Sequence, residues 1–286
     1  MYRKIKITAD STCDLSDELI KKFDVEIIPL HIVYEDESFE DGVNIFPSDI
    51  IERYKTKKQL PKTAAVSMWE YTEHFKKYID NGYEIIHISL GSSISSSHQN
   101  SVAVAAELGH VYSIDSQCLS SASGLLVGKA HDMIQETDMT AQEIADELKK
   151  LVPKTSCSFV IDSLEFLRAG GRCSTLAMLG ANLLKIKPCI EVNNSDGALM
   201  SVGRKYRGKF ENIVTQYTRE KLSQYSSFDT KRIALVSCAV PDEVVNSVYE
   251  IIKELNIFEE ICLTNACCTI TSHCGETALG VMFIAN

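Results

Sequence analysis

The order of apolar and amphipathic segments is the feature of this chain that most limits its fold. Three apolar runs are typical of buried strands: residues 5–9, 84–90 and 111–115. Each run leads through a polar loop into a segment with helical periodicity, at residues 16–23, 97–108 and 120–133. This alternation predicts βαβ units and therefore an α/β fold whose N-terminal sheet is mainly parallel and flanked by helices.

Short-range signals mark the start of further helices. Ser67 with Glu70, and Thr140 with Glu143, fit capping boxes, in which the hydroxyl and the carboxylate each accept a hydrogen bond from a backbone N–H. These pairs predict helices that run to about residues 79 and 151. We also expect Ser48 to cap a helix that ends near residue 57.

The second half of the chain predicts a smaller α/β domain. The segment Asn193-Asn194-Ser195-Asp196-Gly197 joins two extended runs and is typical of a β-hairpin turn. Other expected elements are strands at 157–161, 233–237, 260–264 and 279–284 and helices at 174–184, at 208–224 and from 242. We place the domain boundary near residue 154, which gives an N-terminal domain of residues 1–154 and a second domain of residues 155–286. The C-terminal loop with His273 is expected to return to a site between the domains.

Composition and charge disfavour several classes of function. The formal net charge of -10 opposes binding to nucleic acid and lasting attachment to anionic membranes, so only transient membrane contact is expected. No apolar run approaches the roughly 20 residues of a membrane-spanning helix, and no apolar leader begins the chain, which predicts a cytoplasmic protein. The ten cysteines should then stay reduced. Cys267, Cys268 and Cys274 surround His273, but their spacing matches no common zinc framework, so we expect no metal.

Three polar loops interrupt these apolar surroundings and are the candidate binding site. The first loop, residues 61–67, carries Thr63, and the second, residues 88–99, carries a run of serines. The third carries His273, which follows β-branched residues and is therefore expected at the end of a strand. Hydroxyl and imidazole groups are suited to hold a small oxyanion by hydrogen bonds.

Catalytic interpretations of these loops have weaker support. A serine, a histidine and an acid such as Asp115 would form a hydrolytic triad, but the serines stand in a run and no Gly-x-Ser-x-Gly elbow is present. Nucleotide binding would require a phosphate loop, and Gly170-Gly171-Arg172 lacks the necessary spacing. Asp10, after the first strand, would either bind an ion or, as is more common, cap the next helix.

The polar loops also belong to a longer series of motifs. The series begins with Asp10-Ser11-Thr12-Cys13-Asp14-Leu15, Lys62-Thr63 with Ser67, Ser92-Ser93-Ile94-Ser95 with Gln99, and Asp115-Ser116. It continues with Leu167 and Gly170-Gly171-Arg172, Leu184-Lys185-Ile186-Lys187-Pro188, Asp196-Gly197, Arg204, Arg207, and His273-x-Gly275 with Gly280. In this order, over about residues 4–285, the chain resembles the DegV family, the fatty-acid-binding proteins that serve bacterial fatty acid kinase.

The resemblance implies a two-domain DegV-like fold with one long-chain fatty acid buried between the domains. Four residues would hold its carboxylate: Thr63, Ser95, Ser92 as a close second to Ser95, and His273. Three arginines of the second domain would face the kinase subunit: Arg172, Arg204 and Arg207. The protein would then be a lipid-binding carrier without a cofactor, not an enzyme. It would present the carboxylate to a separate ATP-dependent kinase, which makes acyl phosphate for phospholipid synthesis.

The resemblance also suggests residues for the tunnel wall and an alternative function, and the chain differs from the family pattern at three places. Candidates for the tunnel wall, which at helical spacing are more often ordinary core, are Ala122, Leu125, Leu126, Met178, Leu179, Leu183 and Leu184. The family's fold resembles the substrate-binding part of dihydroxyacetone kinases, where a histidine holds a small ketone, so a small-molecule kinase-like or hydrolytic enzyme is the alternative. The chain departs from the family pattern at Ala64-Ala65-Val66, at Ser96 and His98, and at Glu276-Thr277.

Overall fold

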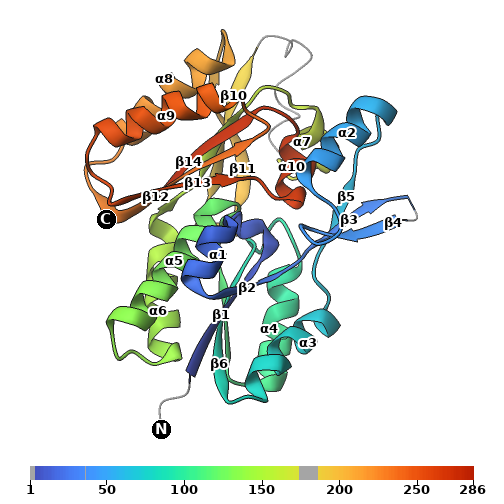
Figure 1. The fold of residues 1–286 in the computed structure, drawn as a ribbon, viewed down its shortest axis with the longest axis vertical. Coiled ribbons are helices and arrows are strands. Elements are labelled where there is room, and N and C mark those ends of the chain that lie inside the picture. Colours follow the sequence, from blue (N-terminus) through green and yellow to red (C-terminus); the bar gives the residue numbers. More distant parts are fainter. Residues whose placement is uncertain (1–3, 36, 174–185) are drawn as a thin grey trace.

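The computed structural model describes residues 4–35, 37–173 and 186–286, and these residues form three β-sheets with helices packed around them (Figure 1). The N-terminal sheet has the strand order β2-β1-β6-β7, and all of its pairs are parallel. Its strands are β1 (Lys4–Asp10), β2 (Val25–Ile28), β6 (Tyr83–Ser89) and β7 (Val111–Asp115). The predicted parallel sheet is confirmed. The helix expected at 174–184, with Met178, Leu179, Leu183 and Leu184, lies outside the described residues.

Helices cover both faces of the parallel sheet. They are α1 (Asp17–Phe23), α3 (Met68–Ile79), α4 (Ser97–Leu108), α5 (Ser121–Glu136) and α6 (Ala141–Leu151). Helices α1, α5 and α6 lie on one side and α3 and α4 on the other (Figure 1). The capping boxes predicted at Ser67 and Thr140 begin α3 and α6. Because the strands are parallel, the polar residues at their carboxyl ends, Asp10, Ser89 and Asp115, lie at one edge of the sheet, where α/β proteins commonly bind ligands.

The second sheet is mixed and lies beside the first. Its strand order is β11-β10-β9-β14-β12-β13, with β8 paired to β14, and only the β12–β13 pair is parallel. Its strands are β8 (Thr155–Ser156), β9 (Ser158–Ile161), β10 (Lys187–Asn193), β11 (Leu199–Tyr206), β12 (Phe228–Cys238), β13 (Glu260–Asn265) and β14 (Ala278–Ala285). Two helices, α8 (Phe210–Ser223) and α9 (Asp242–Glu254), pack on its outer face. The predicted β10–β11 hairpin is confirmed.

Small elements surround the junction of the two sheets. A three-stranded sheet, in the order β4-β3-β5, consists of β3 (His31–Tyr34), β4 (Glu37–Glu40) and β5 (Lys62–Ala64). The helices here are α2 (Pro47–Lys57), α7 (Glu165–Gly170), α10 (Cys268–Cys274), η1 (Ser11–Cys13) and η2 (Val152–Lys154). The cap predicted at Ser48 is wrong, because α2 begins one residue earlier at Pro47, whose ring favours the first helical position. The Asp49 carboxylate accepts the N–H of Phe46 at 2.8 Å and so closes this helix start.

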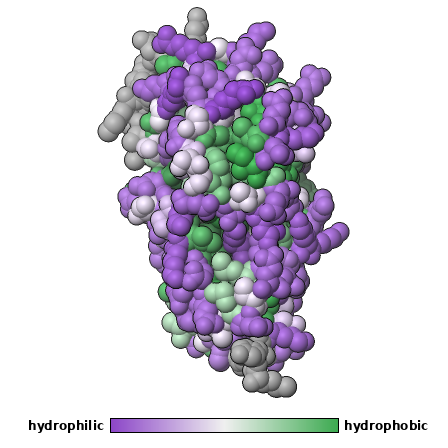
Figure 2. All heavy atoms as spheres, turned by 90° about the vertical axis from the view of Figure 1, so that its left-hand side faces the viewer, coloured by the Kyte–Doolittle hydropathy of each residue, from purple (hydrophilic) through white to green (hydrophobic). Residues whose placement is uncertain are grey.

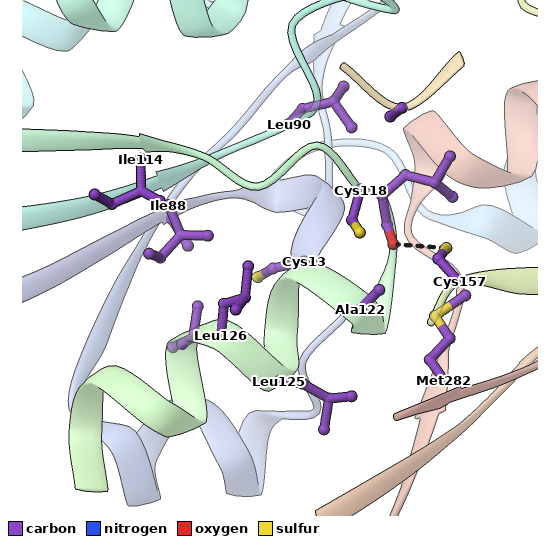
Figure 3. Packing of buried hydrophobic residues seen from close by; sticks show 14 of the residues in the cluster. Cys13, Ile88, Leu90, Ile114, Cys118, Ala122, Leu125, Leu126, Cys157 and Met282 are labelled. Carbon is purple, nitrogen blue, oxygen red and sulfur yellow. Dashed lines mark hydrogen bonds between the residues drawn. The ribbon is translucent and has the colours of Figure 1, made fainter. Parts of the chain in front are cut away.

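One continuous core connects the two large sheets. Helix α5 packs against β1 and β6 on one side and against β12 and β14 on the other. Its residues Ala122, Leu125 and Leu126 are buried in this core beside Cys13 and Ile88 (Figure 3). The structure therefore has the two-domain α/β fold that was expected. The boundary near residue 154 stays a prediction.

Most apolar side chains of the described residues are buried, and the surface is largely polar. The face shown in Figure 2 is mostly hydrophilic, with its largest apolar area on the upper half and smaller apolar areas below it. Within the described part of the chain, no helix has both the length and the apolar character needed to cross a membrane.

Candidate functional site

His273 lies in a helix, so the prediction that it ends a strand is wrong. It is the second-last residue of α10. Residues 269–271, Thr-Ile-Thr, are β-branched and have low intrinsic helix propensity. Hydrogen bonds from residues far away in the sequence outweigh that preference.

Two buried carboxylates hold the N-terminus of α10. Asp41 accepts the backbone N–H groups of Cys268 at 2.8 Å and Thr269 at 2.9 Å, and Asp14 accepts that of Cys267 at 2.9 Å. These are N–H groups that a helix start leaves unpaired, and negative charge is favourable there. Burial raises the pKa of Asp14 to about 7. The two carboxylates fix α10, and with it His273, to loops of the N-terminal half.

The imidazole of His273 is confined on both sides of the ring. Nε2 lies 2.9 Å from Oγ1 of Thr63 on β5. At the other nitrogen the ring lies against α7, because a Cβ atom added to Gly170 would meet Nδ1 at 2.0 Å. Burial, with a smaller contribution from the positive charge of Arg172, lowers the pKa of His273 to about 4. The ring is therefore neutral near pH 7, and its tautomer decides whether it donates to Thr63 or accepts from it.

A cavity of about 240 Å³ lies beside this histidine. The wall includes the side chains of Thr63, Ser95, Ser96, Thr269, Arg172 and His273. The rest of the wall is mostly apolar: Leu30, Ala64, Ala65, Leu90, Ile94, Leu119, Phe159, Leu167, Met200, Ile270 and Cys274. Because Arg172 is exposed and also lines the cavity, the cavity reaches the surface at this side chain.

Asp10 fixes the start of the serine loop. Its carboxylate accepts the N–H of Leu90 at 2.8 Å and the hydroxyl of Tyr71 at 2.6 Å, and it is almost fully buried. These contacts give Asp10 a structural role, and not the role of ion ligand or helix cap that the sequence suggested. Its side chain makes no capping hydrogen bond. Farther along the loop, Ser95 Oγ accepts the N–H of Ser97 at 3.2 Å and still lines the cavity.

The first serines of the loop contact the second sheet and not the cavity. The N–H of Ser93 donates to the carbonyl of Gly197 in the β10–β11 turn at 2.9 Å. The N–H of Ser92 donates to Asp115 at 3.2 Å, and Ser92 is not among the residues that line the cavity. A Cβ atom on Gly91 would meet Cβ of Ala198 at 2.4 Å, so the loop and the turn approach closely.

The three arginines occupy different places. Arg172 lies at the cavity, and its Nη1 donates to the carbonyl of Gly170 at 2.6 Å. Arg204, on β11, is exposed and pairs with Glu220 at 3.0 Å, and Arg207 is exposed just beyond that strand. The structure thus brings together Thr63, Ser95, His273 and Arg172 and leaves the other predicted residues outside the cavity.

The cavity wall differs from the one expected from sequence. Ala122, Leu125 and Leu126 belong to the core and are absent from the lining (Figure 3). The apolar wall comes instead from residues such as Leu30, Phe159 and Met200, which carried no local signal. Within the described ranges, no three His, Cys, Asp or Glu side chains are grouped to hold a metal ion.

Comparison with known proteins agrees with this architecture. The family model described as "Uncharacterised protein, DegV family" matches residues 4–286. A DegV domain-containing protein of Clostridium acetobutylicum is 31% identical, with 98% of each chain covered. A fatty-acid-binding DegV family protein of Thermus thermophilus superposes with a TM-score of 0.88 at 21% identity, covering 99% of this chain and 100% of that one. A stearic-acid-binding protein of Eubacterium ventriosum gives 0.86 at 22% identity, covering 100% and 98%. This chain belongs to the DegV family.

Proposed function

We propose that this protein binds a long-chain fatty acid in the cavity beside His273. It then presents the carboxylate to a separate ATP-dependent kinase, which forms acyl phosphate for phospholipid synthesis. The observation that carries the proposal is the 2.9 Å contact between Thr63 and His273 in the wall of a mostly apolar cavity that Ser95 also lines. The names of the Thermus and Eubacterium proteins, which refer to bound fatty acid, support the same ligand class.

The energetics of such a ligand match the two parts of the cavity. A long acyl chain has about 15 methylenes, each worth roughly 0.8 kcal/mol on leaving water, which is on the order of 12 kcal/mol of gross gain. This gain requires only apolar walls. The carboxylate is the demanding part, because burying it costs several kcal/mol unless it is hydrogen-bonded and paired. The hydroxyls of Thr63 and Ser95 and the imidazole of His273 are donors in the cavity wall that can serve this task.

Arg172 lies both at the cavity and at the surface, where a partner protein could contact it. It is exposed, it lines the cavity, and its charge favours a carboxylate nearby. We assign Arg172, with the exposed Arg204 and Arg207, to contact with the kinase. The carrier would supply orientation and exclude water, and the kinase would supply nucleotide and metal. This role places the protein in the cytoplasm with transient membrane contact.

A hydrolytic role has less support, because the one hydrogen-bonded Ser–His pair among the described residues lies outside the cavity. Ser89 Oγ lies 2.8 Å from Nδ1 of His98, but it also donates to the carbonyl of Ile114 at 3.0 Å. Nδ1 must then donate to Ser89, so His98 does not act as its base. Ser89 is fully buried and does not line the cavity, where a substrate would need to reach it.

Native mass spectrometry of the protein purified from a bacterial host tests the proposal. A co-purified acid of 14 to 18 carbons is the expected result. Loss of that species and binding of a small ketone would favour the kinase-like alternative, and ester turnover abolished by Ser95→Ala would favour a hydrolase. Thr63→Ala or His273→Ala should weaken acid binding by roughly 1–3 kcal/mol, because the carboxylate loses a hydrogen bond. Unchanged affinity in calorimetry would refute the head-group assignment.

A further inference from the structure

Two cysteine side chains meet where the end of α10 packs against β12. Cys238 is the last residue of β12, and Cys274 is the last residue of α10. Sγ of Cys238 donates to the carbonyl of Gly275 at 2.8 Å, and Sγ of Cys274 lies 3.6 Å from the same oxygen. The two side chains are also hydrogen-bonded to each other. The structure therefore holds a pair of neighbouring thiols, which the proposed binding of an acid does not use.

Each thiol lines a space that a small molecule can enter. Cys238 lines a surface groove of about 680 Å³ between α2 and the carboxyl ends of β12 and β13, and exposed residues such as Ser48 and Lys55 also line it. Cys274 lines the cavity beside His273. Both thiols line a narrow cavity of about 30 Å³, which exceeds the roughly 10–15 Å³ needed to hold one water molecule. A molecule as small as hydrogen peroxide therefore fits beside the pair.

Cys238 is the thiol of the pair that is better prepared to react. The hydrogen bond from Cys274 lowers the pKa of Cys238 below its ordinary value, although burial and two nearby carboxylates oppose this change. The hydroxyl of Thr271, 3.3 Å from Sγ of Cys238, also favours the thiolate. Burial instead raises the pKa of Cys262 to about 11. Because the thiolate is the nucleophile in cysteine oxidation, Cys238 should react first.

We propose that Cys238 and Cys274 are a modification site, at which hydrogen peroxide oxidises the two thiols to a disulfide. The thiolate of Cys238 attacks one oxygen of the peroxide, the O–O bond breaks, and the released hydroxide takes up a proton to become water. The sulfur of Cys238 is then a sulfenic acid. The sulfur of Cys274 bonds to it, the S–O bond breaks, and the hydroxyl leaves as a second water with the proton of Cys274. In total, each sulfur loses one electron and each peroxide oxygen gains one.

The disulfide would join the end of α10 to the end of β12. Cys274 directly follows His273 and lines the same cavity, so oxidation changes the cavity wall next to the histidine. The buried carbonyl of Gly275 would also lose the thiol of Cys238 as a donor. A reducing compartment returns the disulfide to two thiols, so the change is reversible.

A second pair of thiols in the same chain is a control. Cys118 and Cys157 are also hydrogen-bonded to each other, and both lie in the core (Figure 3). Neither lines the groove or the two cavities that the first pair lines. The hydrogen bond with Cys157 and burial raise the pKa of Cys118. We therefore expect this pair to stay reduced under conditions that oxidise Cys238 and Cys274.

Peptide mass spectrometry of the full chain tests the proposal. Reduced protein is treated with hydrogen peroxide, the remaining thiols are alkylated, and the chain is digested without reductant. We expect the loss of two of the ten thiols and a cross-linked peptide pair that joins residues 238 and 274. A disulfide between other cysteines would overturn the proposal, as would oxidation of Cys118 and Cys157 at the same peroxide concentration. Retention of all ten thiols would overturn it as well.

Two variants test which sulfur is attacked first. Cys274→Ser removes the second sulfur but keeps a hydroxyl that can donate to Cys238, so oxidation should stop at the sulfenic acid of Cys238, which dimedone traps as an adduct. Cys238→Ser should give neither the disulfide nor an adduct on Cys274. Cys118→Ser is the matched control and should form the same disulfide as wild type. An adduct on Cys274 in the Cys238→Ser variant, or none on Cys238 in the Cys274→Ser variant, would refute the assigned order. Should a variant fail to fold by circular dichroism, the peptide map of the wild-type chain decides.

Discussion

Replacing Gly170 by Ala should displace His273 in the proposed carboxylate site, although residue 170 itself would not contact the ligand. Gly170 ends α7 and faces the His273 ring, and an added Cβ atom would meet Nδ1 at 2.0 Å and Cε1 at 2.8 Å. Ordinary van der Waals contact begins at 3.4 Å, so the two groups must separate by about 1.4 Å (3.4 minus 2.0). The ring has little room to retreat, because Oγ1 of Thr63 already lies 2.9 Å from Nε2. It must therefore rotate, or α7 must move, and either change separates His273 from its partner.

The cost of this displacement should appear mainly in ligand affinity. A hydrogen bond to a charged group is worth about 1.5–3 kcal/mol, so loss of the imidazole contact to the carboxylate should weaken binding roughly 10- to 100-fold. Ala is a better helix residue than Gly, which offsets part of the strain in the folded state. The free energy of unfolding should therefore change less than the free energy of binding.

Calorimetric titration with a long-chain acid, together with urea unfolding, separates the two effects. Gly171→Asn is the matched control, because Gly171 has φ of +67° and no atom within 4 Å of its added Cβ, and Asn tolerates that backbone region. The control should bind within about twofold of wild type. Wild-type affinity of Gly170→Ala would show that His273 does not depend on the space at Gly170. The head-group argument would then fail.

Three further perturbations test other parts of the site. The pKa of His273 is about 4 in the folded protein against an ordinary 6.5, so its contribution to the stability of the ligand-free protein is complete above pH 6.5 and is lost as the pH falls toward 4. The free energy of unfolding in urea should therefore drop between pH 7 and pH 4.5 by about 2 kcal/mol more in wild type than in His273→Gln. Equal drops in the two proteins would contradict the assignment. Asp41→Asn should lower the free energy of unfolding by about 1–3 kcal/mol, because the N–H groups of Cys268 and Thr269 lose a charged acceptor. Hydrogen exchange at these two amides should become faster, and unchanged protection would show that α10 does not need the carboxylate. Arg204→Ala should leave fatty acid affinity unchanged and slow phosphorylation by the kinase, and normal kinase turnover would rule out that contact.

Elements that depend on local signals were predictable from the sequence. The capping boxes at Ser67 and Thr140 begin helices as expected, and the Asn-Gly-rich segment forms the β10–β11 turn. The parallel sheet also followed from sequence, because βαβ alternation restricts strand direction. For the two helix starts and the turn, the decisive contacts lie within a few residues.

The elements that were missed depend on distant partners. Helix α10 forms because Asp14 and Asp41 bind its first N–H groups across more than 220 residues of sequence, and no local pattern reports this pairing. The place of His273 was therefore wrong in secondary structure, although its pairing with Thr63 agrees with the expected grouping. Ser92 and Ser95 look alike in the sequence, and only the β10–β11 turn, which packs on the start of the loop, separates their roles.

The residues that depart from the family pattern make contacts of their own in the structure. Glu276 would place a second negative charge near a bound carboxylate, but its side chain pairs with Lys55 of α2 at 3.1 Å and does not line the cavity. Val66 is fully buried, and its carbonyl accepts from the side chain of Asn100 at 2.7 Å, which ties the first polar loop to α4. Ala64 adds only a small apolar surface to the cavity wall. The contact between Thr63 and His273 does not involve these positions, and of them only Ala64 and Ala65 line the cavity.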